Sequence, residues 1–416
     1  MTPKLPKVTS LTATVSDARN FFMLFFFGLC LAGCGAGTIE TKTGTGGTGE
    51  PPPPLLITEP ATATAALTGV NPINLGGYNM TDTTTTVLLN ATPQRSSADL
   101  RLGMLADAVG GINLNVGEGS ATTAIAQSTV RGPVVSVDAA NKRVTVLGQI
   151  FTLDQNTVLD NMPSLAGLNV GERVEIYALP LGQANNFLAT RFVRIGTVLA
   201  NEPVEILGNA TNISGTQLQV LGITVNAQSA ELAVATPAGF GTPLTSVSAI
   251  TPDSRVRVIG TLNQGTLVAT RVITGLSPRR SEGQLLALNG PLQTAKGAAM
   301  RLLDTDIDAN ALSANLPAGL VVGARVQVRG RITGKSVNAL DVRVYAPGEL
   351  ISYTLDGGIT DFVSSASFRV RGELINATTA QFISGTAGDL AAGKRVKIKG
   401  TAGTGWISAT EVTLVP

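Results

Sequence analysis

The sequence predicts an all-β protein. We expect a tandem array of about five small five-stranded barrels, OB-like or SH3-like, after an N-terminal export signal and a flexible tether. The first observation is composition: of 416 residues, 44% are hydrophobic, 4% aromatic and 14% charged, and 47 are glycine. Such a mixture is typical of many short strands and tight turns. The second is an internal repeat of about 75 residues, and the third is a short apolar run near the N-terminus.

The N-terminal segment has the features of an export signal. Lys4, Lys7 and Arg19 form a positively charged leader, and Phe21–Leu31 is an unbroken apolar run of 11 residues. A membrane-spanning helix needs about 20 apolar residues, whereas the core of a signal peptide needs only about 7–15. We therefore expect residues 1–33 to be a cleaved signal peptide.

The residues around the expected cleavage point, Leu31, Ala32, Gly33 and Cys34, resemble the lipobox of bacterial lipoprotein precursors. The resemblance implies that Cys34 is lipidated, which makes the membrane a partner through two or three acyl chains, enough for a stable anchor. In enterobacterial members an aspartate after the cysteine signals inner-membrane retention. Gly35 stands there, which implies an outer-membrane lipoprotein of the cell envelope, periplasmic or surface-facing. The alternative is an ordinary signal with an incidental cysteine.

The rest of the chain divides into a tether and repeats. Residues 34–60 are rich in glycine and threonine and then contain Pro51–Pro54, so we expect a lipidated, partly stiff tether. The repeats are a degenerate first copy at 61–128, a second at 129–196, a third with an insertion at 197–276, a fourth at 277–347 and a fifth at 348–416.

Three markers recur in the repeats. Glycines open alternating apolar runs at spacings of 76, 75 and 75 residues: Gly132, Gly208, Gly283 and Gly358. A second set of glycines lies in turns between apolar residues: Gly148, Gly222, Gly297 and Gly372. Each repeat then has a strand with two apolar residues at period 2: Val174 and Ile176, Val256 and Val258, Val326 and Val328, Val396 and Ile398.

Each repeat contains enough strands for one small barrel. In the second copy three short strands precede a Pro/Gly-rich crossover at Met162–Val170, and two strands follow it. Five strands with one crossover predict a small, partly open barrel; a long β-sandwich or a continuous solenoid is the alternative. The first copy keeps Gly76, and its opening strand is either missing or hidden near Thr64–Val70. We place the insertion of the third copy at Ala235–Ser246.

The repeat unit resembles a bacterial family, the domain of unknown function 5666. The resemblance rests on a Leu-x-x-Gly-x-x-Val-x-Val-x-Gly pattern and on a closing strand that begins Ala-Thr-Arg. These are carried by Leu320, Gly323, Val326, Val328 and Gly330, by Leu390, Gly393, Val396, Ile398 and Gly400, and by Ala189–Arg191 and Ala269–Arg271. The resemblance covers roughly residues 65–416 and implies an exported lipoprotein without an established activity.

The sequence offers few groups for catalysis. It contains no histidine, which excludes imidazole bases and histidine-ligated metals. Gly330–Ser336 is one residue short of a phosphate-binding loop and lacks a following helix, so we expect a hairpin turn. Asp304, Asp306 and Asp308 alternate as in a calcium loop, but Ala309 replaces its turn glycine, so we expect a solvated strand face. We expect no enzymatic activity, no cofactor and no metal site.

Four arginines recur at one register, each directly before the inward valine: Arg173, Arg255, Arg325 and Arg395. We expect each to point out of its barrel. One interpretation is that charges on exposed strands prevent edge-to-edge aggregation. The other is a row of cationic binding sites for an acidic polysaccharide, lipopolysaccharide phosphates or a protein partner.

Two classes of function remain open. The first is a lipid-anchored, non-enzymatic structural or interaction scaffold of the envelope. The second is a binding module for an anionic glycan, lipopolysaccharide or another anionic envelope ligand. Partners are thus the membrane, through the lipid anchor, and an envelope protein or glycan. The net charge of only +2 argues against a nucleic-acid partner.

Overall fold

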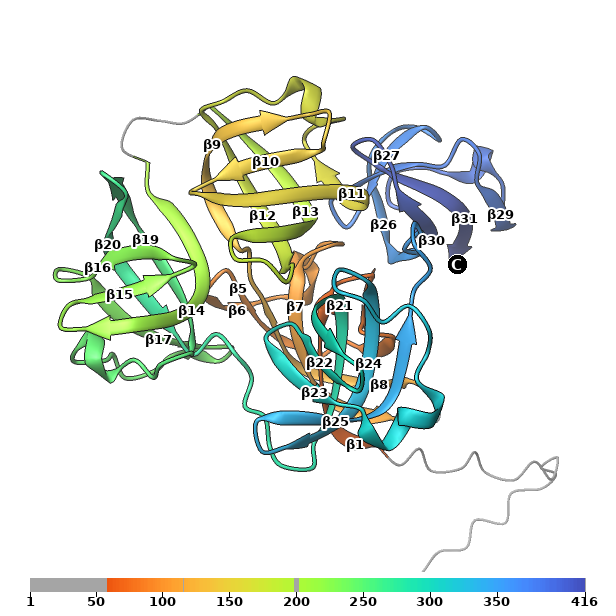
Figure 1. Cartoon of the computed structure of the whole chain (residues 1–416). Helices are drawn as coiled ribbons and strands as arrows, with labels where there is room; N and C mark the ends of the chain where they lie inside the picture. Colours follow the sequence, from red (N-terminus) through yellow and green to blue (C-terminus); the bar gives the residue numbers. More distant parts are fainter. Residues whose placement is uncertain (1–57, 115, 198–201, 416) are drawn as a thin grey trace, which may run out of the picture. The chain divides into compact units, whose positions relative to one another are not determined.

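The computed structural model describes residues 58–114, 116–197 and 202–415. The predicted signal peptide, Cys34 and the tether up to residue 57 lie outside the described residues. Within them the chain forms strands joined by turns and by five short 3₁₀ helices. In this part of the chain, no helix is long and apolar enough to cross a membrane. Figure 1 shows the strands grouped into barrels, coloured from orange to indigo along the chain.

The segment after residue 129 folds as a closed five-stranded barrel, named barrel 2. Its elements are β9 (Val130–Asp138), β10 (Arg143–Val146), β11 (Gln149–Asp160), η2 (Leu165–Gly167), β12 (Glu172–Pro180) and β13 (Asn186–Thr197). The first three strands form an antiparallel meander. The crossover through η2 leads to a β12–β13 hairpin that closes the ring, because β13 runs parallel to β11 and β12 pairs with β9. The predicted inward residues Val174 and Ile176 are completely buried.

Barrels 3, 4 and 5 repeat this connectivity. Barrel 3 consists of β14 (Val204–Ser214), β15 (Gln217–Val220), β16 (Ile223–Asn226), β17 (Glu231–Thr236), β18 (Gly239–Phe240), η3 (Val247–Ala249), β19 (Arg255–Asn263) and β20 (Thr266–Thr274). Barrel 4 consists of β21 (Leu285–Lys296), β22 (Ala299–Leu302), β23 (Thr305–Asp308), η4 (Asn310–Asn315), β24 (Arg325–Thr333) and β25 (Ser336–Val344). Barrel 5 consists of β26 (Tyr353–Ser364), β27 (Ser367–Val370), β28 (Glu373–Asn376), β29 (Gln381–Ser384), η5 (Ala387–Asp389), β30 (Arg395–Ala402) and β31 (Ile407–Val415).

In each of these barrels, the long first strand pairs with the second strand and with the strand after the 3₁₀ helix. The last strand runs parallel to the third. These pairings confirm the prediction of small five-stranded barrels in an all-β protein.

Barrel 1 corresponds to the degenerate first repeat, and its opening strand is present in two pieces. Its elements are β1 (Glu59–Ala66), β2 (Gly69–Val70), β3 (Ile73–Leu75), β4 (Tyr78–Thr81), β5 (Thr86–Leu89), β6 (Thr92–Arg95), η1 (Ser97–Asp99), β7 (Leu105–Asn113) and β8 (Glu118–Ala126). β1 pairs with β7, β2 pairs with β3, and β8 runs parallel to β4 and β5. Because β1 begins at Glu59, the barrel starts two residues before the predicted boundary at 61.

Strands also pair between barrels. β1 runs parallel to β21, β2 runs parallel to β26, and β14 pairs with β9. Barrels 1, 4 and 5 therefore share one 19-stranded hydrogen-bonded sheet, and barrels 2 and 3 share a 12-stranded sheet. β1 is hydrogen-bonded on both of its edges, to β7 of its own barrel and to β21 of barrel 4. Backbone hydrogen bonds therefore join the predicted repeats.

Several predicted glycine alignments are wrong in barrels 4 and 5. The opening glycine of barrels 2 and 3 lies opposite the first inward valine. In barrel 4 this place belongs to Gly290, and Gly283 precedes the strand; in barrel 5 it belongs to Gly357 and not to Gly358. Gly297 lies in the first hairpin turn, between β21 and β22, instead of the second. Equal spacing misleads here because the connections between strands differ in length.

The glycine near the end of the strand after the 3₁₀ helix marks a β-bulge. Gly110, Gly330 and Gly400 lie at shifts in the pairing of the β7–β8, β24–β25 and β30–β31 hairpins. A Cβ atom at these positions would lie 1.8, 2.3 and 2.4 Å from a carbonyl oxygen of the neighbouring strand. Only glycine fits without movement of the backbone.

The predicted insertion, Ala235–Ser246, contains the short strand β18, which folds back on β17. The insertion contacts barrel 1 through Gln94. The backbone N–H of Gln94 donates to the Pro237 carbonyl at 3.0 Å, and its side-chain amide donates to the Ala238 carbonyl at 2.9 Å. The inserted hairpin therefore links barrel 3 to barrel 1.

Candidate functional site

The four arginines of the predicted register lie at the start of the strand that carries the inward valines. Arg255, Arg325 and Arg395 are the first residues of β19, β24 and β30, and Arg173 is the second residue of β12. Each precedes a buried valine, so its side chain leaves its own barrel core, as predicted. The surroundings of the four differ, because each faces a different segment of the chain.

Arg173 and Arg255 are held by carboxylates. Arg173 is only 3% exposed, and its guanidinium pairs with Glu202 and donates to the Pro203 carbonyl at 2.7 Å. Arg255 of barrel 3 reaches a carboxylate oxygen of Asp107 in barrel 1 at 3.3 Å. Both guanidiniums are therefore already paired with a carboxylate of the chain.

Arg395 is also paired with a carboxylate, whereas Arg325 is not. Nε of Arg395 lies 2.7 Å from Oδ1 of Asp356, and the hydrogen bond and charge of this carboxylate raise the pKa of Arg395. Arg325 has a neutral partner instead: its Nε donates to the amide oxygen of Asn289 at 3.2 Å. Among the described residues, no hydrogen bond or ion pair involves the two terminal nitrogens of Arg325.

The Arg325 guanidinium is fixed against Tyr345. Its central carbon lies 4.1 Å from the ring centroid, and that of Arg343 lies 4.4 Å from the same centroid. The Tyr345 hydroxyl donates to Oε1 of Gln327 at 2.9 Å and accepts from the amide of Asn289 at 2.9 Å. These bonds fix the ring, and the ring attracts the guanidinium through a cation–π contact. Arg325 is thereby oriented, and no other described residue binds its terminal N–H groups.

Arg325 lines a cleft between barrels 2 and 4. The cleft has a volume of about 1120 Å³ and is bounded by the middle of β11, the loop before β24 and the segment after β25. A smaller cavity of about 310 Å³ shares Arg325 and Tyr345 with it. The cleft lining also contains the charged residues Lys142 and Asp154 and the apolar residues Val321 and Val322, among others.

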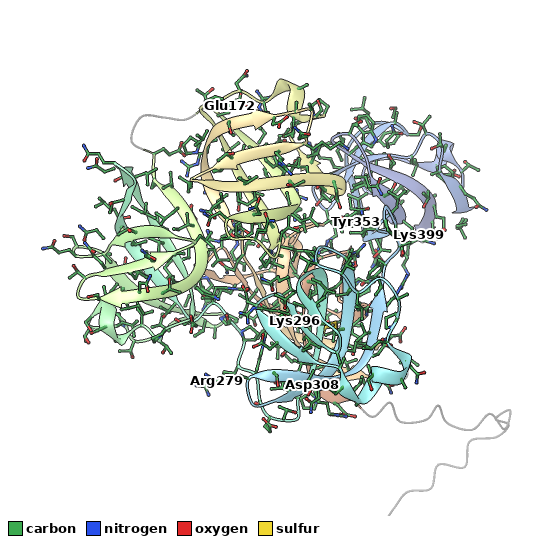
Figure 2. All side chains as sticks on the ribbon, viewed as in Figure 1. Glu172, Arg279, Lys296, Asp308, Tyr353 and Lys399 are labelled. Carbon is green, nitrogen blue, oxygen red and sulfur yellow. The ribbon has the colours of Figure 1, made fainter. Side chains whose placement is uncertain are left out.

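A bulge in β11 holds the segment between barrels 4 and 5 against one side of this cleft. Asp154 Oδ1 accepts from the backbone N–H of Asn156 at 2.8 Å. The Asn156 side chain donates to the Glu349 carbonyl at 3.1 Å and accepts from the Ile351 N–H at 2.8 Å. The hydroxyl of Tyr353, labelled in Figure 2, donates to the Asn156 carbonyl at 2.7 Å. Three hydrogen bonds to Asn156 thus set the position of this wall of the cleft.

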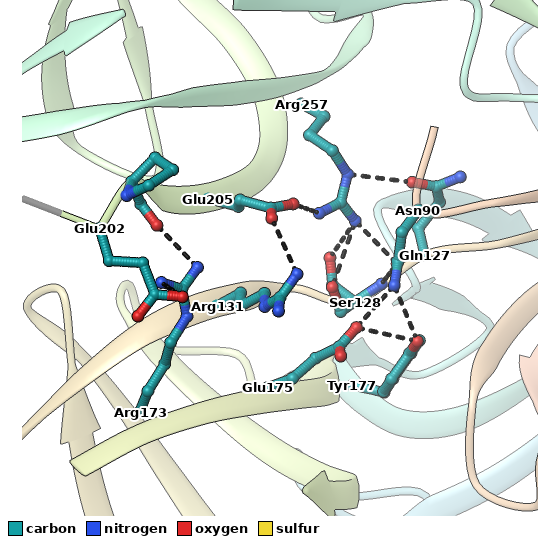
Figure 3. A network of polar contacts seen from close by, with 11 residues as sticks. Asn90, Gln127, Ser128, Arg131, Arg173, Glu175, Tyr177, Glu202, Glu205 and Arg257 are labelled. Atoms are coloured by element: carbon teal, nitrogen blue, oxygen red, sulfur yellow. Dashed lines mark hydrogen bonds and ion pairs between the residues drawn. The ribbon is translucent and has the colours of Figure 1, made fainter. Parts of the chain in front are cut away.

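A cluster of charged residues is buried where barrels 1, 2 and 3 meet (Figure 3). Arg257 lies two residues after Arg255 in β19, on the side of the strand that faces away from its barrel core, and has no exposed surface. It pairs with Glu205 at 2.8 Å and donates to the Asn90 side chain at 3.1 Å, the Ser128 carbonyl at 2.9 Å and the Gln127 side chain at 3.2 Å. It points out of its own barrel but into the contact with barrel 1 and with the residues that lead from barrel 1 to barrel 2.

Arg191 joins barrels 1, 2 and 5. Its side chain is 2% exposed, pairs with Asp160 of its own barrel and with Glu373 of barrel 5 at 2.8 Å, and donates to the Leu102 carbonyl of barrel 1 at 3.0 Å. Burial opposes its charge, but the two carboxylates outweigh burial and raise the pKa of Arg191. Sequence reasoning found the arginine within the Ala-Thr-Arg motif and missed its role, because Glu373 is 182 residues away.

The remaining motifs are strand and turn features. Gly330–Ser336 spans the hairpin turn between β24 and β25, as predicted. Asp304, Asp306 and Asp308 bind three different partners: a glutamine, an arginine and the backbone at the start of η4. Within the described part of the chain, no group of three or more His, Cys, Asp or Glu residues is placed to hold a metal ion.

The fold and its repeated connectivity define a protein built from small β-barrels in tandem. Two segments, residues 131–191 in barrel 2 and 356–413 in barrel 5, match the family described as Domain of unknown function (DUF5666). These two matches confirm the resemblance seen in the sequence motifs for barrels 2 and 5; barrels 1, 3 and 4 lie outside the matched segments. None of the curated proteins and none of the solved structures compared with the chain matches it.

Proposed function

We propose that the protein is a lipid-anchored, non-enzymatic scaffold of the cell envelope, held in the outer membrane through Cys34. The observation that carries this proposal is the placement of buried charge between barrels. Arg191 links barrels 1, 2 and 5, Arg257 links barrel 3 to barrel 1, and both side chains are almost fully buried. Buried ion pairs add little net stability but favour one arrangement over others. Barrels held in one arrangement present their surfaces at set distances, as a scaffold requires.

The anchor is tested with the full chain in a Gram-negative host. Labelling with a palmitate analogue should mark the parent at Cys34, and the labelled protein should sediment with outer membranes. Cys34→Ala should be unlabelled and leave the membrane fraction, because one cysteine carries the lipid. A soluble, unlabelled parent would contradict the anchor.

The scaffold role is tested by crosslinking in intact envelopes followed by mass spectrometry. We expect the parent to crosslink reproducibly to an envelope component. Arg191→Met should reduce this crosslink, because it loosens the contact among barrels 1, 2 and 5. Arg271→Met is the matched control, since its ion pair with Glu231 is exposed and lies within barrel 3. A parent without crosslinks, or equal losses in both variants, would count against the scaffold role.

The second candidate is binding of an anionic glycan, lipopolysaccharide or another anionic envelope ligand. The observation that favours it is Arg325, whose terminal nitrogens are unbound in the cleft between barrels 2 and 4. Binding of envelope polysaccharide to the purified chain should weaken as salt rises, because screening shortens the reach of the charge.

A further inference from the structure

We propose that the cleft between barrels 2 and 4 binds an acidic oligosaccharide, a glycan with a carboxylate on its sugar ring, and that this carboxylate pairs with Arg325. The inference rests on the second proposed function and deepens it, because it names the site and the class of sugar.

The repeats themselves indicate what Arg325 lacks. In barrel 5 the register arginine, Arg395, binds Asp356, which precedes the glycine opposite the inward valine. The residue at the same place in barrel 4 is Asn289, directly before Gly290. An amide therefore replaces the internal carboxylate, and the positive charge of Arg325 is left for an external one.

The guanidinium is prepared for such a ligand. Asn289 accepts a hydrogen bond from Nε of Arg325, and the Tyr345 ring lies against the face of the guanidinium. Little side-chain freedom is therefore lost when a ligand binds. The two terminal nitrogens form a planar fork that matches both oxygens of a carboxylate. Because Asn289 and Tyr345 are neutral, they orient Arg325 and leave its full positive charge available to a ligand.

The charge of the cleft favours a carboxylate over a phosphate. Arg343 and Glu349 pair at 3.0 Å and neutralise each other. Lys142 and Arg325 then oppose Asp154, which leaves one net positive charge in the lining. A sugar carboxylate carries one negative charge. A phosphate monoester carries about two negative charges near neutral pH. Its second negative charge would lie beside the carboxylate of Asp154.

The rest of the cleft suits the body of a sugar chain. Asp154 is exposed, and a carboxylate acts only as an acceptor, so its Oδ2 can receive sugar hydroxyls. Val321 and Val322, 61% and 58% exposed, give apolar surface for the C–H faces of the rings. The volume of about 1120 Å³ exceeds the usual range of about 300–1,000 Å³ for small-molecule sites, so several linked sugars fit better than one.

The test uses the full chain in detergent, with trigalacturonate as the probe in isothermal titration calorimetry. Two variants remove the site in different ways. Arg325→Gln removes the charge, and Asn289→Asp supplies the internal carboxylate that barrel 5 already has. Each should weaken binding about 10- to 100-fold, the range for charge-assisted hydrogen bonds. Arg325→Lys should be intermediate, because it keeps the charge without the fork. Arg395→Gln, at the same register outside the cleft, should bind like the parent.

The outcomes separate the site from the function. Equal binding by the parent, Arg325→Gln and Asn289→Asp would overturn the site while leaving the anionic-glycan function standing. Equal binding of the methyl-esterified probe, or of inorganic phosphate, would overturn the class of ligand. A parent that binds no trigalacturonate would overturn the inference; the function on which it rests would be overturned by a parent that also binds no envelope polysaccharide. Unchanged Trp406 fluorescence and melting temperature show that each variant is folded.

Discussion

Replacement of Arg191 by methionine removes a side chain that contacts barrels 1, 2 and 5 together. Its guanidinium, 2% exposed, pairs with Asp160 and Glu373 and donates to the Leu102 carbonyl. Methionine fills a similar volume without charge. Glu373, with a side chain 5% exposed, would keep only the hydrogen bond from the backbone N–H of Leu102 at 3.0 Å. The variant therefore leaves a buried carboxylate without its cation.

The cost follows from this burial. Breaking a buried ion pair by removal of one partner costs about 3–5 kcal/mol, most of it from the charge left behind. Arg271 occupies the corresponding place in barrel 3 and pairs with Glu231, whose side chain is 62% exposed. Such surface pairs contribute about 0–1 kcal/mol. Arg271→Met should therefore change the free energy of unfolding far less than Arg191→Met.

Urea unfolding followed by tryptophan fluorescence measures the difference. The chain has one tryptophan, Trp406, which lines a cavity between barrels 2 and 5 together with Glu373 and Met162. Adding Glu373→Gln to Arg191→Met should recover part of the lost stability, because the unpaired charge is removed. If Arg191→Met costs no more than Arg271→Met, or if the double variant recovers nothing, buried charge does not hold these barrels together.

Three further outcomes are expected. Gly400→Ala should destabilise the protein by about 1–3 kcal/mol, because its Cβ would overlap a carbonyl oxygen at the bulge; a melting temperature equal to that of the parent would contradict this. Val396→Asp should abolish cooperative unfolding of barrel 5, because it places an unpaired charge at a position with no exposed surface, as circular dichroism would show. Hydrogen bonds from Thr386 hold the pKa of Asp389 below its ordinary value. The interaction between these two residues at the start of η5 therefore stabilises the fold at pH values above the ordinary pKa of aspartate. This stabilisation is lost as the pH falls through the lower pKa of the folded state. Thr386→Ala should raise the pKa of Asp389, measured by NMR titration; an unchanged titration would exclude Thr386 as the cause.

The barrels were predictable because their signals are local. Alternation places Val174 and Ile176 on one side of a strand, and both are fully buried. The closing glycines, such as Gly330, are required where a bulge brings two backbones close together. Each of these features depends on a few neighbouring residues, so it is visible in one sequence.

The contacts between barrels were not predictable in the same way. Glu373 and Arg191 carry no spacing signal, since 182 residues separate them. Arg257 looks like an outward basic residue near the start of an alternating strand, and whether an outward side chain reaches solvent depends on which barrel lies beside it. Alternation fixes the side of a strand on which a residue lies; it contains no information about the neighbour on that side.

The glycine misalignment and the candidate site are connected. A spacing of 75 residues matches Asp356 with Ser281, because it aligns Gly358 with Gly283. Strand pairing matches Asp356 with Asn289 instead, since Gly357 and Gly290 are the residues opposite the inward valines. Only in this register does barrel 4 show an amide where barrel 5 has a carboxylate. Arg325 then differs from Arg395 because it lacks an internal carboxylate partner. Whether Arg325 prevents aggregation of an exposed strand or binds a ligand therefore depends on one residue, Asn289.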